Sequence, residues 1–164
     1  MAHQSDQDKS QTFHIVRSDP DAVRAEQTRL LDLIRKVIPH GSLSAIGSTA
    51  IDGVIGKGDL DFALGVSRDK FDLARSNLEV AFTRDLIQLS NDEFQGFVLP
   101  SNFDASLQLF VSGGEYDTFD KFLELLRNDA ELRKDYNDLK LRWDGKPMDQ
   151  YRDAKRRFIE RTLP

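Results

Sequence analysis

Apolar and polar residues alternate most regularly in two segments in the middle of the chain. Along residues 59–66 every even-numbered position is apolar, whereas Asp59 and Asp61 fall on the opposite face. Residues 103–111 repeat the pattern, with apolar residues at the odd-numbered positions. Because side chains alternate between the two faces of a strand, both segments are predicted to be β-strands with one face towards the core.

Weaker patterns predict further elements around these two strands. Short strands are expected at residues 43–46, 83–89 and 94–99, the last two joined as a hairpin. Apolar residues at a spacing of three and four predict helices, and Asp19 before Pro20 is typical of a helix start. The helical segments are residues 20–38, 67–80, 119–126, 132–143 and 151–162. The expected fold class is therefore α+β, a mixed β-sheet of about five strands with packed helices and a helical C-terminal part.

The composition is typical of one globular domain. The chain has 164 residues, of which 39% are hydrophobic and 31% charged. Residues 1–12 are polar and lack periodicity, which predicts a disordered leader before a single domain at residues 13–164. The absence of cysteine excludes disulfides and thiolate metal sites. With no apolar N-terminal run and no stretch of ~18 apolar residues, the expected location is the cytoplasm, with no membrane partner.

The charge distribution limits the possible partners. The net charge of −5 argues against bulk nucleic-acid binding, which depends on cationic side chains that neutralise phosphates. The densest basic cluster, at residues 152–161, is interpreted mainly as the solvated face of a helix near its C-terminal end.

The paired aspartates are the strongest candidates for chemistry. At positions i and i+2 of a strand, Asp59 and Asp61 point the same way, roughly 6–7 Å apart. Two carboxylates so close repel each other unless a cation neutralises them, and a divalent ion that prefers oxygen ligands, such as Mg²⁺, is suited to this. The alternative is a polar strand face exposed to water.

A Gly-Ser turn precedes this pair. Gly47 and Ser48 end the predicted strand at 43–46, and Ser48 lies 11 positions before Asp59. Glycine permits close approach of the backbone, and the serine hydroxyl can donate to a phosphate oxygen. The hypothesis is a phosphate site beside the aspartates, and the alternative is a plain turn.

Asp104 is the candidate for a third carboxylate at this site. Asp104 lies on the polar face of the strand at 103–111, which could meet the Asp59 and Asp61 face. It is therefore either a third metal ligand or a surface residue.

The Gly-Ser, spacer, Asp-x-Asp order resembles the nucleotidyltransferases of the DNA polymerase beta type. The chain is more closely similar to the GrpB family, which is assigned to that superfamily, over roughly residues 18–160. The matching segments are residues 47–54 (Gly-Ser-Thr-Ala-Ile-Asp-Gly-Val), 57–61 (Lys-Gly-Asp-Leu-Asp), 132–140 and 151–159. The chain departs from the family pattern at Ala45, Asp52, Gly58 and Gln108, and it carries both aspartates where the family often keeps only the second.

The resemblance implies a nucleotidyltransferase-like fold and a metal-dependent reaction. It implies that Asp59, Asp61 and Asp104 are the catalytic and metal-binding residues, with Mg²⁺ or Mn²⁺ as the cofactor. It adds Lys57 and Lys155 to Gly47 and Ser48 as nucleotide-binding residues. The substrate would be a nucleoside triphosphate, and the nucleotidyl group would pass to an unknown acceptor, a small molecule or a macromolecule. The alternative is a catalytically silent nucleotide-binding or protein-interaction domain on the same fold.

Overall fold

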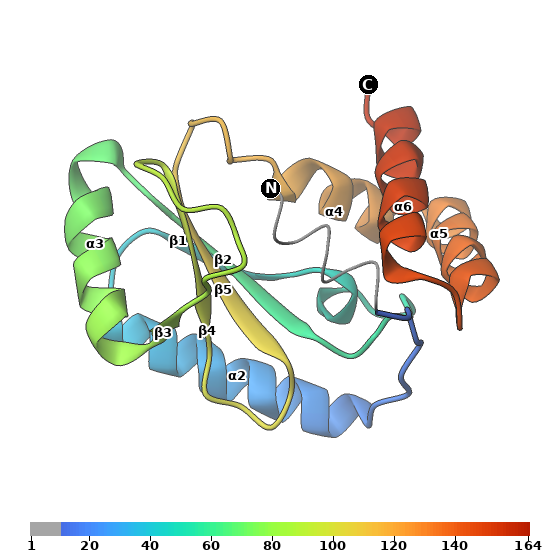
Figure 1. The fold of residues 1–164 in the computed structure, drawn as a ribbon, viewed down its shortest axis with the longest axis horizontal. Helices are drawn as coiled ribbons and strands as arrows, with labels where there is room; N and C mark the ends of the chain where they lie inside the picture. The colour runs from blue at the N-terminus through green and yellow to red at the C-terminus, as the bar shows by residue number, and fades with distance from the viewer. Residues whose placement is uncertain (1–10) are drawn as a thin grey trace.

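The centre of the molecule is a five-stranded mixed sheet, seen in a computed structural model that describes residues 11–164 (Figure 1). The strand order is β1-β2-β5-β4-β3. The strands are β1 (Ser42–Ile46), β2 (Leu60–Val66), β3 (Thr83–Arg84), β4 (Phe94–Val98) and β5 (Ala105–Val111). Strands β2 and β5 are parallel, and the other neighbouring pairs are antiparallel. The predicted α+β class and mixed sheet are therefore confirmed.

Two helices cover the apolar face of β2. Helix α2 (Pro20–Val37) and helix α3 (Arg68–Ala81) contribute Leu30, Ile34, Phe71 and Leu78 to one buried cluster. The even-numbered residues of β2 and the odd-numbered residues of β5 complete this cluster, as the alternation predicted. Helix α2 begins as expected, because the Asp19 side chain accepts from the Asp21 amide and Pro20 occupies the first turn.

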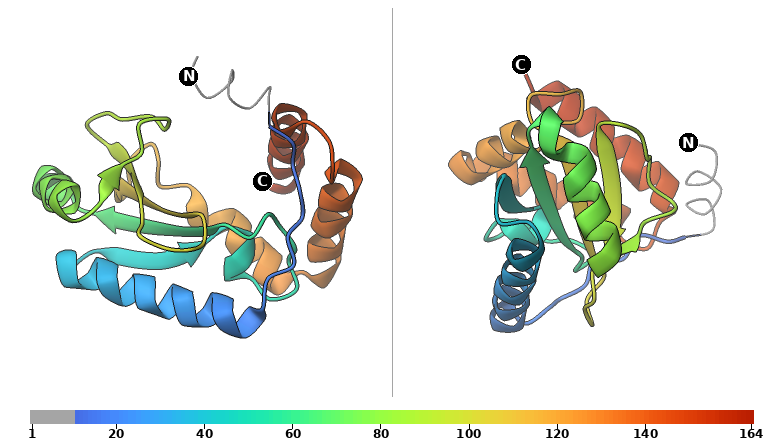
Figure 2. Two further views of the ribbon diagram at one scale, coloured as in Figure 1. Left: turned by 60° about the horizontal axis from the view of Figure 1, so that its bottom comes forward. Right: turned by 90° about the vertical axis from the view of Figure 1, so that its left-hand side faces the viewer.

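The C-terminal helices stand together at one end of the sheet (Figures 1 and 2). They are α4 (Phe119–Asn128), α5 (Ala130–Trp143) and α6 (Met148–Thr162). Their apolar residues, including Leu126, Tyr136 and Leu139, pack with Ile46 and Ala63 from the opposite face of β1 and β2. This second cluster lies directly beside the aspartate face of β2. No helix within residues 11–164 is long and apolar enough to cross a membrane.

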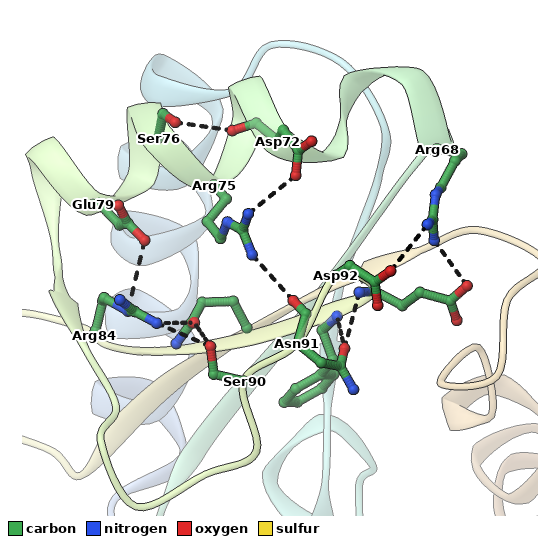
Figure 3. A network of polar contacts seen from close by, with 12 residues as sticks. Arg68, Asp72, Arg75, Ser76, Glu79, Arg84, Ser90, Asn91 and Asp92 are labelled. Atoms are coloured by element: carbon green, nitrogen blue, oxygen red, sulfur yellow. Dashed lines mark hydrogen bonds and ion pairs between the residues drawn. The ribbon is translucent and has the colours of Figure 1, made fainter.

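The predicted hairpin strand at 83–89 is much shorter than expected. Only Thr83 and Arg84 pair with β4, and the residues that follow form a loop. An arginine network ties this loop to its surroundings (Figure 3). From α3, the Arg75 guanidinium donates to the Asn91 carbonyl at 3.1 Å, and Arg68 contacts Asp92. These side-chain bonds replace the strand pairing that the apolar pattern suggested, and they hold the loop after β3 in place.

An extended N-terminal segment, residues 11–16, crosses the C-terminal helices as a strap. The Phe13 amide donates to the Lys146 carbonyl at 2.8 Å, and the Phe13 ring stacks on Tyr151 at 3.8 Å between centroids. The Val16 amide donates to the Gly56 carbonyl at 2.9 Å. The strap includes Gln11 and Thr12, which the polar composition assigned to the leader. The remainder of that leader, residues 1–10, lies outside the described residues.

We predict that the strap is anchored by Phe13. Phe13→Ala removes a fully buried ring and its stacking on Tyr151, so the free energy of unfolding should fall by about 3 kcal/mol in urea denaturation. Val16→Ala is the matched control, because Val16 is 51% exposed, and its loss should cost less than about 1 kcal/mol. Equal effects of the two substitutions would contradict the assignment.

Candidate active site

Asp61 lies at the centre of the site, where three strands fix its position. In the sheet it pairs with Ile46 of β1 on one side and with Ser106 of β5 on the other. The Ser106 hydroxyl donates to Asp61 Oδ1 at 2.7 Å. Gly47 follows Ile46 with φ +75°, and a Cβ there would stand 3.0 Å from Asp61 Oδ2. Glycine is therefore required at position 47 both for its backbone conformation and for its closeness to the carboxylate.

The environment of Asp61 disfavours its negative charge. Burial, and next the neighbouring carboxylate of Asp59, raise the pKa of Asp61 from 3.8 to about 6. The Ser106 hydrogen bond and the cations of Lys57 and Lys155 oppose that shift only in part. Lys57 Nζ lies 3.3 Å from Asp59 Oδ2 and partly neutralises that residue instead. The two carboxylates supply oxygen atoms, the ligand type that a divalent cation such as Mg²⁺ prefers.

Asp104 does not join the pair in a cluster of three carboxylates. Leu60 and Ala105 are the first paired residues of β2 and β5, so Asp59 and Asp104 each immediately precede this pair. Asp104 is exposed, although it lines the same cavity as Asp59 and Asp61. Among residues 11–164, no three or more acidic or histidine side chains are grouped so that they could hold a metal ion. The strand position opposite Asp61 belongs to Ser106, and the metal role of Asp104 stays a prediction.

Lys140, which the sequence analysis did not place in the site, forms a hydrogen bond with the Gly-Ser turn. Ser48 begins a single turn of 3₁₀ helix, Ser48–Ala50. Lys140 of α5 donates hydrogen bonds to the Ser48 hydroxyl and, at 2.5 Å, to the Ile55 carbonyl. Only 1% of Lys140 is exposed, and its Nζ lies 4.3 Å from the centre of the Tyr136 ring. The sequence did contain one indication of this contact. Lys140 directly follows Leu139, a core position of the predicted helix, so its side chain could have been expected near the protein interior.

Burial also shifts the ionisation of this lysine. Desolvation, and next the cation of Lys155, lower the pKa of Lys140 from 10.5 to about 7, while Asp59 acts in the opposite direction. In both Asp61 and Lys140, therefore, the surroundings disfavour the charged form of the side chain. Perturbed ionisation of this kind is common where a protein binds charged ligands.

Asp61 lines two cavities. The first, of about 400 Å³, we call the apolar cavity. It is bounded by Gly47, Ser48 and Asp61 from the sheet side and by α4–α6, chiefly through Phe122, Leu126, Tyr136, Lys155 and Ile159. The second, of about 350 Å³, we call the polar cavity. Its lining includes Lys57, Asp59, Asp61, Asp85, Asp104, Ser106 and Arg152. The two cavities share Asp61 alone among these residues.

The cavities divide the residues that the sequence singled out. Gly47, Ser48 and Lys155 face the apolar cavity together with Asp61. Lys57 lines the polar cavity with Asp59, and its role as a nucleotide-binding residue stays a prediction. The arrangement can hold a phosphate chain on one side of Asp61 and a second molecule on the other.

We predict that Asp61 lowers the stability of the ligand-free protein above pH 6. Because its folded pKa is raised, the native state binds the proton more tightly than the unfolded chain, and this stabilising contribution is lost as pH rises through 6. Asp61→Asn should therefore raise the free energy of unfolding by about 1–2 kcal/mol at pH 7.5, with a gain that shrinks towards pH 4. Asp104→Asn is the matched control and should change little. A loss of stability in Asp61→Asn at pH 7.5 would refute the prediction.

Comparison with known proteins gives the same family as the motifs. The model of the GrpB protein family matches residues 12–164. A UPF0157 protein of Vibrio cholerae is 32% identical over 131 residues, which cover 79% of this chain and 70% of that protein. The crystal structure of the conserved protein GrpB from Enterococcus faecalis has a TM-score of 0.57 and 16% identity, and the match covers 90% of this chain and 98% of that chain.

A weaker likeness extends to the Cid1 poly(U) polymerase bound to Mg 3'-dATP. Its TM-score is 0.48 at 20% identity, and the match covers 73% of this chain and 40% of that chain. The family model and the Vibrio cholerae relative each cover most of the sequence. The chain therefore belongs to the GrpB family.

Proposed function

We propose that this protein is a nucleotidyltransferase that uses Mg²⁺ or Mn²⁺ and a nucleoside triphosphate to modify a hydroxyl group on an acceptor. The observation that carries the proposal is the position of Asp61, which lines both cavities. Transfer between two bound molecules requires that they meet at one point, and Asp61 is that point. The Gly-Ser turn lines only the apolar cavity, so we assign the nucleotide to the apolar cavity and the acceptor to the polar cavity.

The apolar cavity suits the nucleotide. Ser48 can donate its hydroxyl to a phosphate oxygen, and Lys155 lines the same space with a positive charge. The half-buried ring of Phe122 lines the same cavity and offers an apolar surface for the nucleoside.

Asp59 and Asp61 are the residues that would hold the metal. Burial, and next the carboxylate of Asp59, make the negative charge of Asp61 costly, and a bound cation would relieve that cost. When bound, Mg²⁺ or Mn²⁺ would offset the charge that develops on the phosphate during an in-line displacement.

The polar cavity suits the acceptor. In the proposed reaction an acceptor hydroxyl oxygen forms a bond to the α-phosphorus, the bond from this phosphorus to the bridging oxygen breaks, and pyrophosphate leaves. The hydroxyl proton needs a base within the acceptor cavity, and Asp104 is an exposed carboxylate in its lining. Its proposed role is therefore to accept the proton of the acceptor hydroxyl.

One observation favours a second candidate function, a catalytically silent nucleotide-binding domain. Ser106 occupies the strand position opposite Asp61, where a carboxylate would strengthen a metal site. A protein with only two such ligands could bind a nucleotide without transferring it. The two candidates agree on binding and differ on turnover.

The binding half of the proposal is tested by thermal unfolding with each of the four nucleoside triphosphates, with and without Mg²⁺. At 100 times its Kd, a ligand that binds only the folded state adds about 2.7 kcal/mol to the free energy of unfolding, which raises the melting temperature. We expect a Mg²⁺-dependent rise in the wild type that disappears in Asp59→Ala/Asp61→Ala and persists in Asp52→Asn, an exposed control. No rise with any nucleotide would overturn both candidate functions.

Turnover separates the two candidates. The nucleotide that binds is incubated with Mg²⁺ and pools of hydroxyl-bearing acceptors, and released pyrophosphate is measured. We expect release that depends on an acceptor and falls at least 100-fold in Asp104→Asn, while nucleotide binding by that variant stays within threefold of the wild type. Binding without acceptor-dependent pyrophosphate release would favour the silent domain.

A further inference from the structure

Lys140 lies behind the Gly-Ser turn rather than in the nucleotide cavity. Its Nζ contacts the Ser48 hydroxyl and the Ile55 carbonyl, while Ser48 itself lines the apolar cavity. Lys140 is not among the residues that line either the apolar or the polar cavity. With 1% of its surface exposed, it reaches a ligand only through another residue.

The chemistry of the ammonium group fixes the direction of the Ser48 hydrogen bond. When Lys140 is protonated, as it would be beside a bound anion, it has three hydrogens and no acceptor, so the Ser48 oxygen must accept from it. The single hydroxyl hydrogen of Ser48 is thereby left to donate elsewhere. Within residues 11–164, no hydrogen bond is found in which the Ser48 hydroxyl is the donor. The hydroxyl hydrogen of Ser48, a residue that lines the apolar cavity, is therefore without an acceptor in the described part of the chain.

The packing leaves Lys140 and Ser48 little room to separate. A Cβ on Gly56 would stand 2.9 Å from Ser48 Cβ, 3.0 Å from Ser48 Oγ and 3.6 Å from Lys140 Nζ. The Gly56 backbone thus packs directly against the Ser48 side chain and close to the Lys140 ammonium group. Three segments, the Gly-Ser turn, the Ile55-Gly56 loop and α5, converge on one buried ammonium group.

Within residues 11–164 no carboxylate forms an ion pair with Lys140. The charges that act on it are the cation of Lys155 from α6 and, with opposite sign, the carboxylate of Asp59. The Tyr136 ring supplies only a weak attraction. Buried charges are stable when they are paired, so an anion at Ser48 would complete the site.

We propose that Lys140 is a positioning residue for phosphate: acting through Ser48, it directs the serine hydroxyl at a phosphate group in the apolar cavity and supplies the positive charge behind it. This inference deepens the proposed nucleotide site and rests on it. It differs from direct contact, in which the lysine itself would touch the phosphate.

A double-mutant cycle tests whether Lys140 acts through Ser48. The probe is inorganic tripolyphosphate, measured by calorimetry with the wild type, Ser48→Ala, Lys140→Met and the double variant. We expect each single substitution to weaken binding at least tenfold and the double variant to bind no more than threefold weaker than the weaker single variant. Independent effects that multiply would show that Lys140 contacts phosphate by itself and would overturn the inference, as would unchanged binding by Lys140→Met.

Two further readouts separate positioning from a merely structural role. Since Lys140→Met removes a buried charge but also the donor to the Ile55 carbonyl, its melting temperature is measured beside binding, and a variant that is folded at the titration temperature shows that its loss of binding does not come from unfolding. If the methionine variant does not fold, Lys140→Gln replaces it. Gln also keeps a donor for Ser48 and should recover part of the affinity.

Proton uptake is the second readout. An anion beside Lys140 should raise its pKa from about 7, so the wild type should take up protons on binding at pH 7.5, as measured in buffers of different ionisation enthalpy. Lys140→Met should take up fewer, and equal uptake by the two proteins would overturn the inference. A wild type that binds neither tripolyphosphate nor any nucleotide would instead refute the proposed function itself.

Discussion

The register of β2 between β1 and β5 is the constraint on which the site depends. It sets Asp61 between the end of β1, where Gly47 turns the chain, and Ser106, which donates to its carboxylate. A shift of one residue would move Asp61 to the face covered by α2 and α3. The apolar residues on that face prevent such a shift. The core therefore fixes the position of the charged side chain that both cavities share.

Two ionisable groups of opposite sign, the half-buried Asp61 and the buried Lys140, then lie in the site without pairing with each other. Asp61 is held by a serine, and Lys140 is held by a serine hydroxyl and a carbonyl. Each is costly to charge in the ligand-free protein, as the pKa shifts show. In the proposed function a metal ion at Asp61 and a phosphate near Lys140 would offset these two costs.

The sequence predicted the parts of this account that depend on local periodicity. The alternation around Asp59 and Asp61, the Asp19-Pro20 helix start and the C-terminal helices all follow from nearby residues. It did not predict the short β3, because the Arg75 bond to Asn91 and its neighbours form only after folding. Nor could it place Lys140 on Ser48, 92 positions away, or set Ser106 opposite Asp61, since both depend on how distant segments pack.

The most direct test of the central claim is a crystal structure of the protein with Mn²⁺ and a nucleoside triphosphate analogue that cannot be cleaved at the α-phosphate. The account predicts an anomalous manganese peak at the Asp59 and Asp61 carboxylates, phosphate oxygens at Ser48 and the nucleoside in the apolar cavity beside Phe122. A nucleotide bound elsewhere, or one bound in the apolar cavity with no metal at Asp61, would contradict it.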